Sequence, residues 1–131
     1  MSIDAIGDFL TIIRNGLMAS KRSVVAPYSK LKFEIVKILK EEGFVKDFEI
    51  VEEEPSKKLV KVFLKYVDGE SVIHEIVRKS TPGRRVYERA SQMKFVIGKL
   101  GISIVTTNKG IMTNKKAREL SVGGEVICSI W

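Results

Sequence analysis

The spacing of apolar residues changes once along this chain, and that change most restricts the fold. Before Gly43, two segments carry apolar residues at the spacing of an amphipathic helix. After it, apolar and polar residues alternate with the period of a β-strand. The helical sets are Ile6, Phe9, Leu10, Ile13 and Leu17, and then Leu31, Ile35, Ile38 and Leu39. A chain of 131 residues with both periods predicts an α/β (α+β) fold.

The ends of the two helices are marked by capping residues. Ser2 is an N-cap candidate for the first helix, and Ser29 is one for the second. Gly43 is expected to end the second helix. Its lysines are expected on the solvent side; they are Lys30, Lys32, Lys37 and Lys40.

Strands are expected around these helices. Residues 24–26 form a short one, and the alternating segments 44–50 and 60–66 form two more. A further strand over 71–77 should follow the Asp68-Gly69 turn. This first lobe is therefore of the α-β-α-β-β type, with antiparallel pairing.

The second lobe is expected to be mostly β with a short helix. Strands are predicted at 85–88, 102–107 and 126–130, and Thr113 should cap a helix that reaches about Leu120. Pro82-Gly83 breaks the chain before them, and the glycines Gly98, Gly101 and Gly110 punctuate the lobe. We expect two small, tightly packed lobes, 1–77 and 78–131.

The excess of positive charge lies in the second lobe. Residues 1–77 hold 12 Lys or Arg and 13 Asp or Glu, a net charge of −1, whereas residues 78–131 hold 11 and 3, a net charge of +8. Such asymmetry is typical of a chain that contacts a polyanion.

Nothing in the sequence predicts catalysis, a metal or a cofactor. The single His74 and single Cys128 cannot supply a zinc ligand set, and Cys128 is expected to be a small core residue. The acidic run Glu52–Glu54 precedes a turn composition and is expected at a solvated hairpin tip. The sequence has no apolar run long enough to span a bilayer, no signal peptide and no disulfide pair, so a cytoplasmic protein is expected.

Two segments of the basic lobe could contact RNA. Arg85, Tyr87 and Arg89 would share one face of a strand, where guanidinium groups bind phosphates and a ring stacks on an unpaired base. The alternative is a solvated edge strand. Residues 106–110 combine short donors and acceptors with a glycine that lets a backbone approach closely, although they could form an ordinary polar loop. Thr113, Lys115 and Lys116 begin a helix whose free amides attract anions, or one that is merely capped.

Several blocks of the sequence resemble the family of bacterial small-subunit ribosomal protein eight. They are MSIDAIGDFLTIIRNG (1–16), SKLK (29–32), LKEEGF (39–44), PGRRVY (82–87), GISIVTTNKGIMT (101–113) and GGEVIC (123–128). Their order is the family's order and they extend over nearly the whole chain.

The resemblance implies a structural, primary rRNA-binding protein of the small subunit. It would bind an irregular helix in the central domain of small-subunit rRNA, aid assembly of the platform beside neighbouring ribosomal proteins, and in some bacteria repress its own operon by binding the mRNA. The loop residues Thr106, Thr107 and Asn108, with Lys109 and Gly110, match the family's RNA-contacting loop. Tyr87 and Glu125 match positions near it, with Arg84 and Arg85 close by, and Lys30 matches a backbone-contacting position. Thr106 and Asn108 stand where the family commonly has serines, and Asn114 replaces a usual acidic residue, which would make that stretch more positive.

Two other classes of function stay open at this stage. An RNA-acting enzyme would need a convergent carboxylate pair, and the basic lobe offers only Glu88, Glu119 and Glu125. A protein-interaction module could use the basic face on acidic partners. A membrane or a small-molecule substrate is not expected.

Overall fold

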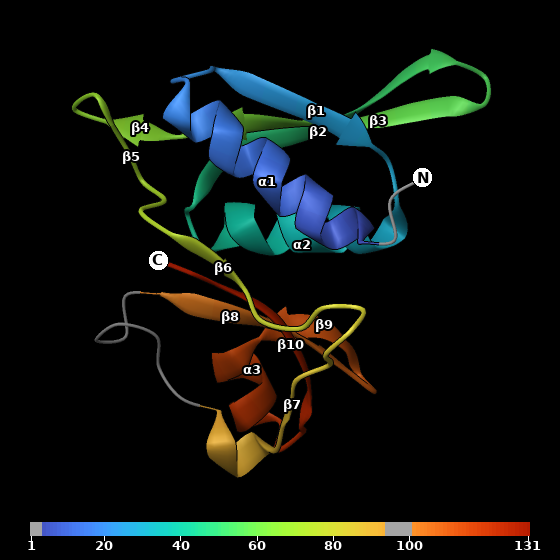
Figure 1. Ribbon diagram of the computed structural model, residues 1–131, viewed down its shortest axis with the longest axis vertical. Helices are drawn as coiled ribbons and strands as arrows, with labels where there is room; N and C mark the ends of the chain where they lie inside the picture. Colours follow the sequence, from blue (N-terminus) through green and yellow to red (C-terminus); the bar gives the residue numbers. More distant parts are fainter. Residues whose placement is uncertain (1–3, 94–100) are drawn as a thin grey trace. The chain divides into compact units, whose positions relative to one another are not determined.

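The computed structural model describes residues 4–93 and 101–131, which form two compact units (Figure 1). The N-terminal unit is Ala5–Ile73, and the C-terminal unit is Asp4 with the described part of residues 74–131. The division falls four residues before the boundary expected at Val77, because the strand over Ile76–Arg78 pairs within the C-terminal unit. The predicted cap Ser2 and the predicted break at Gly98 lie outside the described residues.

The N-terminal unit packs two helices on an antiparallel sheet. Its elements are α1 (Ala5–Met18), β1 (Ser23–Pro27), α2 (Lys30–Glu41), β2 (Val45–Glu54), β3 (Lys57–Leu64) and the small hairpin β4 (Tyr66–Val67) with β5 (Glu70–Ser71). The larger sheet has the order β1-β3-β2. α1 packs on β1 and β3, and α2 packs on β2 and β3 (Figure 1). The buried core includes Phe9, Leu10, Ile13, Ile35, Leu39, Val60 and Val62.

The capping predictions for α2 are confirmed. The Ser29 Oγ accepts a hydrogen bond from Lys32 N at 3.2 Å, and Gly43 has a φ of +80° directly after the C-cap. One prediction on this helix is wrong: Lys32 is buried, not solvated. Its ammonium group donates to Pro27 O at 3.0 Å, which compensates for the burial of the charge.

The strand predicted over 71–77 is also wrong. The Asp68-Gly69 turn exists, with φ of 52° and 81°, but β5 ends at Ser71. The Ser71 hydroxyl donates to Ile73 O at 2.8 Å. The chain then starts a new strand, β6 (Ile76–Arg78), which pairs with the last strand of the chain. Local alternation cannot reveal that one apolar run is divided between two sheets.

The C-terminal unit is a sheet with one short helix on it. Its elements are β6, β7 (Tyr87–Glu88), the 3-10 helix η1 (Ala90–Gln92), β8 (Ile102–Thr107), β9 (Gly110–Thr113), α3 (Asn114–Glu119) and β10 (Gly124–Ile130). The order is β6-β10-β8-β9, and β7 also pairs with β10. Ala117 of α3 packs into the cluster of Met93, Val105, Met112 and Val126. The predicted α+β class and the Thr113 cap, which accepts from Lys116 N at 3.2 Å, are confirmed.

A buried polar network lies beside this core. Asn114 is only 5% exposed and its Oδ1 accepts from Ser103 N at 3.0 Å. The Ser103 and Ser129 hydroxyls share a hydrogen bond of 2.9 Å. Asn114 is therefore a structural residue. The expectation that a neutral residue at 114 makes this stretch more positive than an acidic one would stays a prediction.

Cys128 is a core residue, as predicted. Burial raises the pKa of its thiol from 9.0 to about 12. We expect iodoacetamide to leave Cys128 unmodified in the native protein at pH 8.5 and to alkylate it after unfolding in urea, because the reagent needs the thiolate. The raised pKa also makes the free energy of unfolding depend on pH. Between pH 9.0 and about 12 the Cys128 thiol loses its proton only in the unfolded chain, so the stability of the protein falls as the pH rises through this range. Mass spectrometry of alkylation against urea concentration checks this, and rapid labelling of the native protein would contradict it.

No helix within 4–93 and 101–131 is long and apolar enough to cross a membrane. No group of three or more His, Cys, Asp or Glu side chains in those ranges could hold a metal ion.

Candidate nucleic-acid interface

Three of the predicted site residues form a row across the sheet of the C-terminal unit. Tyr87 on β7 is opposite Glu125 on β10, and Glu125 is opposite Thr106 on β8. Directly opposed residues of antiparallel strands carry their side chains on the same face. Residues far apart in the sequence are thus brought together. Tyr87 is 68% exposed, so its ring is available for stacking.

The turn between β8 and β9 is held by a threonine. The Thr107 hydroxyl donates to Gly110 O at 2.8 Å and accepts from Lys109 N at 3.0 Å. Gly110 has a φ of +112°, which only glycine adopts readily. Because its one hydrogen is already used, Thr107 fixes the turn. Thr106 and the exposed Asn108 and Lys109 are the side chains left to meet a ligand.

Glu125 is held by partners within the protein. Its Oε2 accepts from the buried Ser80 hydroxyl and from the Arg85 guanidinium, the latter at 3.2 Å. The Ser80 Oγ in turn accepts from Val86 N at 3.1 Å. A carboxylate bound in this way fixes Arg85 and the segment before β7 next to the row of Tyr87, Glu125 and Thr106. Glu125 therefore positions its neighbours.

Gly124 allows the strands under this row to approach closely. A Cβ at Gly124 would overlap the Thr106 carbonyl oxygen and lie 2.9 Å from the Thr106 carbonyl carbon. Gly123 is similar, since its Cβ would lie 2.6 Å from Glu88 O. The Gly-Gly pair therefore sets the spacing of β7, β10 and β8.

The structure does not bring every predicted residue to this row. The strand predicted over 85–88 is reduced to β7, so Arg85 and Arg89 lie outside it. Arg84 is exposed in the turn that Pro82-Gly83 makes, where its backbone N and O pair with Thr81. Lys30 begins α2 in the N-terminal unit.

Thr113, Lys115 and Lys116 belong to a different part of the C-terminal unit. Thr113 is buried and its hydroxyl caps α3. α3 packs through Ala117 on the face that carries Val105, the neighbour of Thr106 on β8. Since successive strand residues point to opposite faces, α3 covers the face opposite the row. Lys115 and Lys116 are exposed on that helix.

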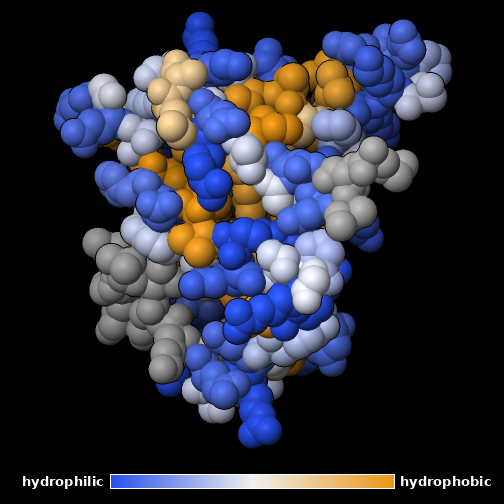
Figure 2. Space-filling model, in the orientation of Figure 1, coloured by the Kyte–Doolittle hydropathy of each residue, from blue (hydrophilic) through white to orange (hydrophobic). Residues whose placement is uncertain are grey.

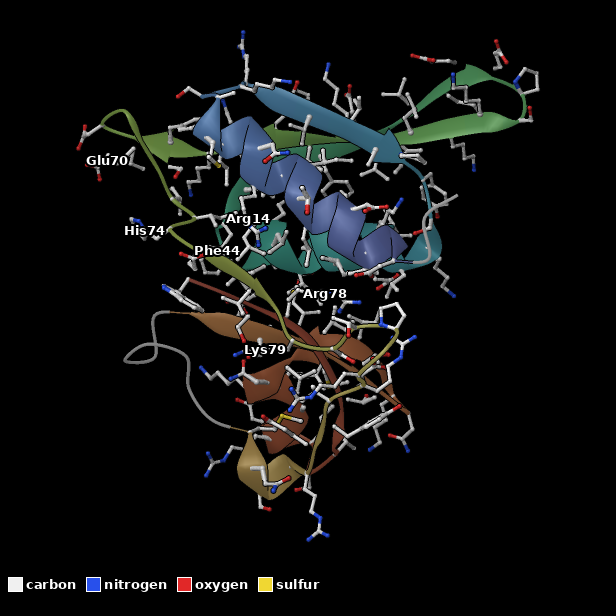
Figure 3. The ribbon with its side chains drawn as sticks, viewed as in Figure 1. Arg14, Phe44, Glu70, His74, Arg78 and Lys79 are labelled. Carbon is white, nitrogen blue, oxygen red and sulfur yellow. The ribbon has the colours of Figure 1, made fainter. Side chains whose placement is uncertain are left out.

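Sequence reasoning missed Ser80 and the anchoring of Arg78. Ser80 is fully buried against Glu125, a contact across 45 residues that no local pattern indicates. Arg78, labelled in Figure 3, donates to Ile127 O at 2.9 Å and pairs with Asp4 at 3.0 Å. The positive charge of Arg78, which was counted among the basic residues of 78–131, is therefore neutralised by Asp4 within the C-terminal unit. Hydrophilic residues still cover most of the face of this unit seen in Figure 2.

The chain is similar to ribosomal proteins over its whole length. The family model described as ribosomal protein S8 matches residues 4–131. The small ribosomal subunit protein uS8 of Koribacter versatilis is 48% identical over 132 residues, covering 100% of this chain and 98% of its own. That of Thermodesulfovibrio yellowstonii is 46% identical over 132 residues, covering both chains fully. That of Pseudomonas fluorescens is 48% identical over 128 residues, covering 98% and 97%.

Proposed function

The chain belongs to the ribosomal protein S8 family, and from that premise we propose that it binds an irregular helix in the central domain of small-subunit rRNA. Family membership makes it a structural protein of the small ribosomal subunit and not an enzyme. This bears out the prediction of a non-enzymatic ribosomal protein. The RNA element and the contacting residues are our proposal.

The observation that carries the proposal is the row of Tyr87, Glu125 and Thr106 beside the turn that exposes Asn108. A-form RNA hides its base edges in a deep, narrow groove, so a specific protein needs unpaired or distorted nucleotides. An exposed ring can stack on such a base, while a hydroxyl and an amide can bond its edge. Gly110 lets the RNA backbone approach the turn.

The basic residues around the row would bind phosphates without reading sequence. Arg85 is oriented by Glu125 at 3.2 Å, and Arg84 and Lys109 are exposed nearby in the chain. Lys115 and Lys116 lie on the other face, so they would reach a different part of the RNA. Such contacts set affinity and its dependence on salt.

Neutralising some of these cations should weaken RNA binding and also make the affinity less dependent on salt concentration. We expect the triple variant Arg84→Gln, Lys115→Gln, Lys116→Gln to bind an irregular central-domain stem less tightly. The slope of log K against log salt should fall by roughly 0.7 to 0.9 for each phosphate that the variant no longer neutralises. Arg85 is left intact because its removal would free Glu125. Filter binding over a series of KCl concentrations measures the slope.

A matched control comes from the N-terminal unit. Lys57→Gln and Lys58→Gln at exposed positions, with Lys37→Gln at a half-buried one, remove the same charge. Lys37 and Lys57 form ion pairs with Glu34 and Glu53. This control should change the slope less. A control that flattens it as much as the test variant would place the phosphate contacts elsewhere.

Two further roles and a location follow from the same RNA contact. We propose that the protein aids assembly of the platform beside neighbouring ribosomal proteins, and that it binds a similar structure in its own operon mRNA to repress translation. We also propose that it acts in the cytoplasm, within the ribosome. The repression role can be tested by measuring whether an operon mRNA fragment displaces the rRNA stem from the protein. The variants that weaken binding to the stem should weaken binding to the fragment as well.

A further inference from the structure

A second basic site lies in the N-terminal unit, remote in sequence from the row of Tyr87, Glu125 and Thr106. It is an open cavity of about 420 Å³, formed where β1 begins and β3 ends. Its lining residues are Arg22, Lys46, Phe63, Leu64, Lys65 and Tyr66. We call it the basic–aromatic groove. Three of its six lining residues are cationic, two are aromatic, and none is acidic.

The cations of the groove have no ion-pair partner in the part of the chain that the structure describes. Among the described residues, no carboxylate lies within ion-pair distance of Arg22, Lys46 or Lys65. Asp47 is adjacent to Lys46 in sequence, but it pairs with Lys40 at 2.9 Å. Glu70 lies at the outer end of the β4–β5 hairpin (Figure 3) and does not line the groove. The N-terminal unit is nearly neutral as a whole, so this is a local concentration of positive charge.

Two features of the sheet place Lys46 and Arg22 at the groove. The register between β2 and β3 shifts between Val45 and Asp47, so Lys46 is the unpaired residue of a bulge and is exposed. The Arg22 carbonyl accepts from Leu64 N at 3.0 Å, which fixes the start of β1 against the end of β3. Bulges often re-aim a side chain towards a functional site.

The aromatic residues of the groove are also held in place. The Tyr66 hydroxyl donates to Lys21 O at 2.6 Å, and partial burial raises the pKa of this phenol. The ammonium group of Lys61 lies 5.2 Å from the centre of the Phe63 ring. Fixed rings beside cations form the surface that single-stranded RNA uses, since bases stack on rings and phosphates meet Lys and Arg.

We propose that the basic–aromatic groove binds a single-stranded segment of small-subunit rRNA. This inference rests on the proposed function, because it assigns a second RNA contact to the same protein. RNA is favoured over an acidic protein segment because the groove joins cations to stacking surfaces. The cavity volume is in the range that ligand sites use.

The test compares Arg22→Gln, Lys46→Gln, Lys65→Gln with the control Lys37→Gln, Lys57→Gln, Lys58→Gln. The probe is an in vitro transcript of the rRNA central domain that keeps its single-stranded flanks. We expect the groove variant to flatten the salt slope by about 1.4 to 2.1 more than the control, because two or three phosphates of a single strand are no longer neutralised, at roughly 0.7 each. Ultraviolet crosslinking of the wild type should attach RNA to tryptic peptides 62–65 or 66–78, which contain Phe63 and Tyr66.

The outcomes separate this inference from the function on which it rests. If the wild type does not bind the transcript, the proposed function fails. If the wild type binds but the groove variant and its control have equal slopes, and crosslinks map only to residues 78–131, the groove does not bind RNA. A groove variant that binds RNA like the control yet competes poorly with the wild type for incorporation into small subunits would show a protein occupant instead, and would also overturn the inference.

Discussion

Replacing Gly124 by alanine is expected to destabilise the protein by about 3 kcal/mol, the upper end of the usual cost of overpacking. The added Cβ would overlap the Thr106 carbonyl oxygen and lie 2.9 Å from the Thr106 carbonyl carbon. Both are backbone atoms, so no side-chain rotation relieves the clash. β10 and β8 would have to separate at the row of Tyr87, Glu125 and Thr106. Equilibrium unfolding in urea, followed by circular dichroism, measures the change.

Gly83→Ala is the matched control for this change. A Cβ at Gly83 would meet nothing within 4 Å, and Gly83 has no positive φ. We expect the free energy of unfolding of the Gly83→Ala variant to stay within about 0.5 kcal/mol of the wild type, as for most surface substitutions. Whatever folded Gly124→Ala protein remains should also lose preference for the irregular stem over a paired duplex. Equal stability of the two variants would mean that the close approach of the strands is not required.

Local chemistry made much of this fold predictable. Ser29, Gly43 and Thr113 act at single helix ends, and each does so through atoms a few residues away in sequence. Asp68-Gly69 likewise forms its turn by local φ preference. Such signals can be read from the sequence because they depend on few neighbours.

Contacts that apolar periodicity does not encode account for what the sequence did not reveal. The run 71–77 looks like one strand, but its second half pairs with β10, some 50 residues away. Lys32 looks like a surface lysine, yet it is buried and its ammonium group donates to Pro27 O, five residues earlier in the chain. In neither case does the periodicity of apolar residues identify the partner.

The candidate site was predictable in part. Charge asymmetry and the polar segment 106–110 indicated the region, and the resemblance named Tyr87 and Glu125 before any geometry was known. The resemblance could not distinguish a side chain that meets a ligand from one that fixes the turn or its neighbours. Thr107 and Glu125 use their polar atoms within the protein, whereas Asn108 is exposed. That division is visible only in hydrogen bonds.

The largest effect on RNA specificity is expected from Thr106→Ala with Asn108→Ala. Each hydrogen bond removed should cost on the order of 1 kcal/mol, and more where a buried RNA group is left without its partner. The preference for the irregular stem over a perfectly paired duplex of equal length should therefore fall about 10- to 30-fold. The salt slope should not change, because neither side chain neutralises a phosphate. Fluorescence binding of both RNAs at several salt concentrations gives the ratio and the slope together.

Lys109→Gln is the control, since it changes the same turn but removes a charge. It should weaken binding to both RNAs by a similar factor and reduce the slope. Circular dichroism must first show that all three substitutions leave the fold intact, because Thr106 lies in β8 opposite Glu125. If the Thr106 and Asn108 double variant keeps the wild-type ratio between the two RNAs, the turn does not read the RNA. Residues 106–110 would then be an ordinary polar loop at the end of a strand, and the source of specificity would have to be sought at Tyr87 and Arg85.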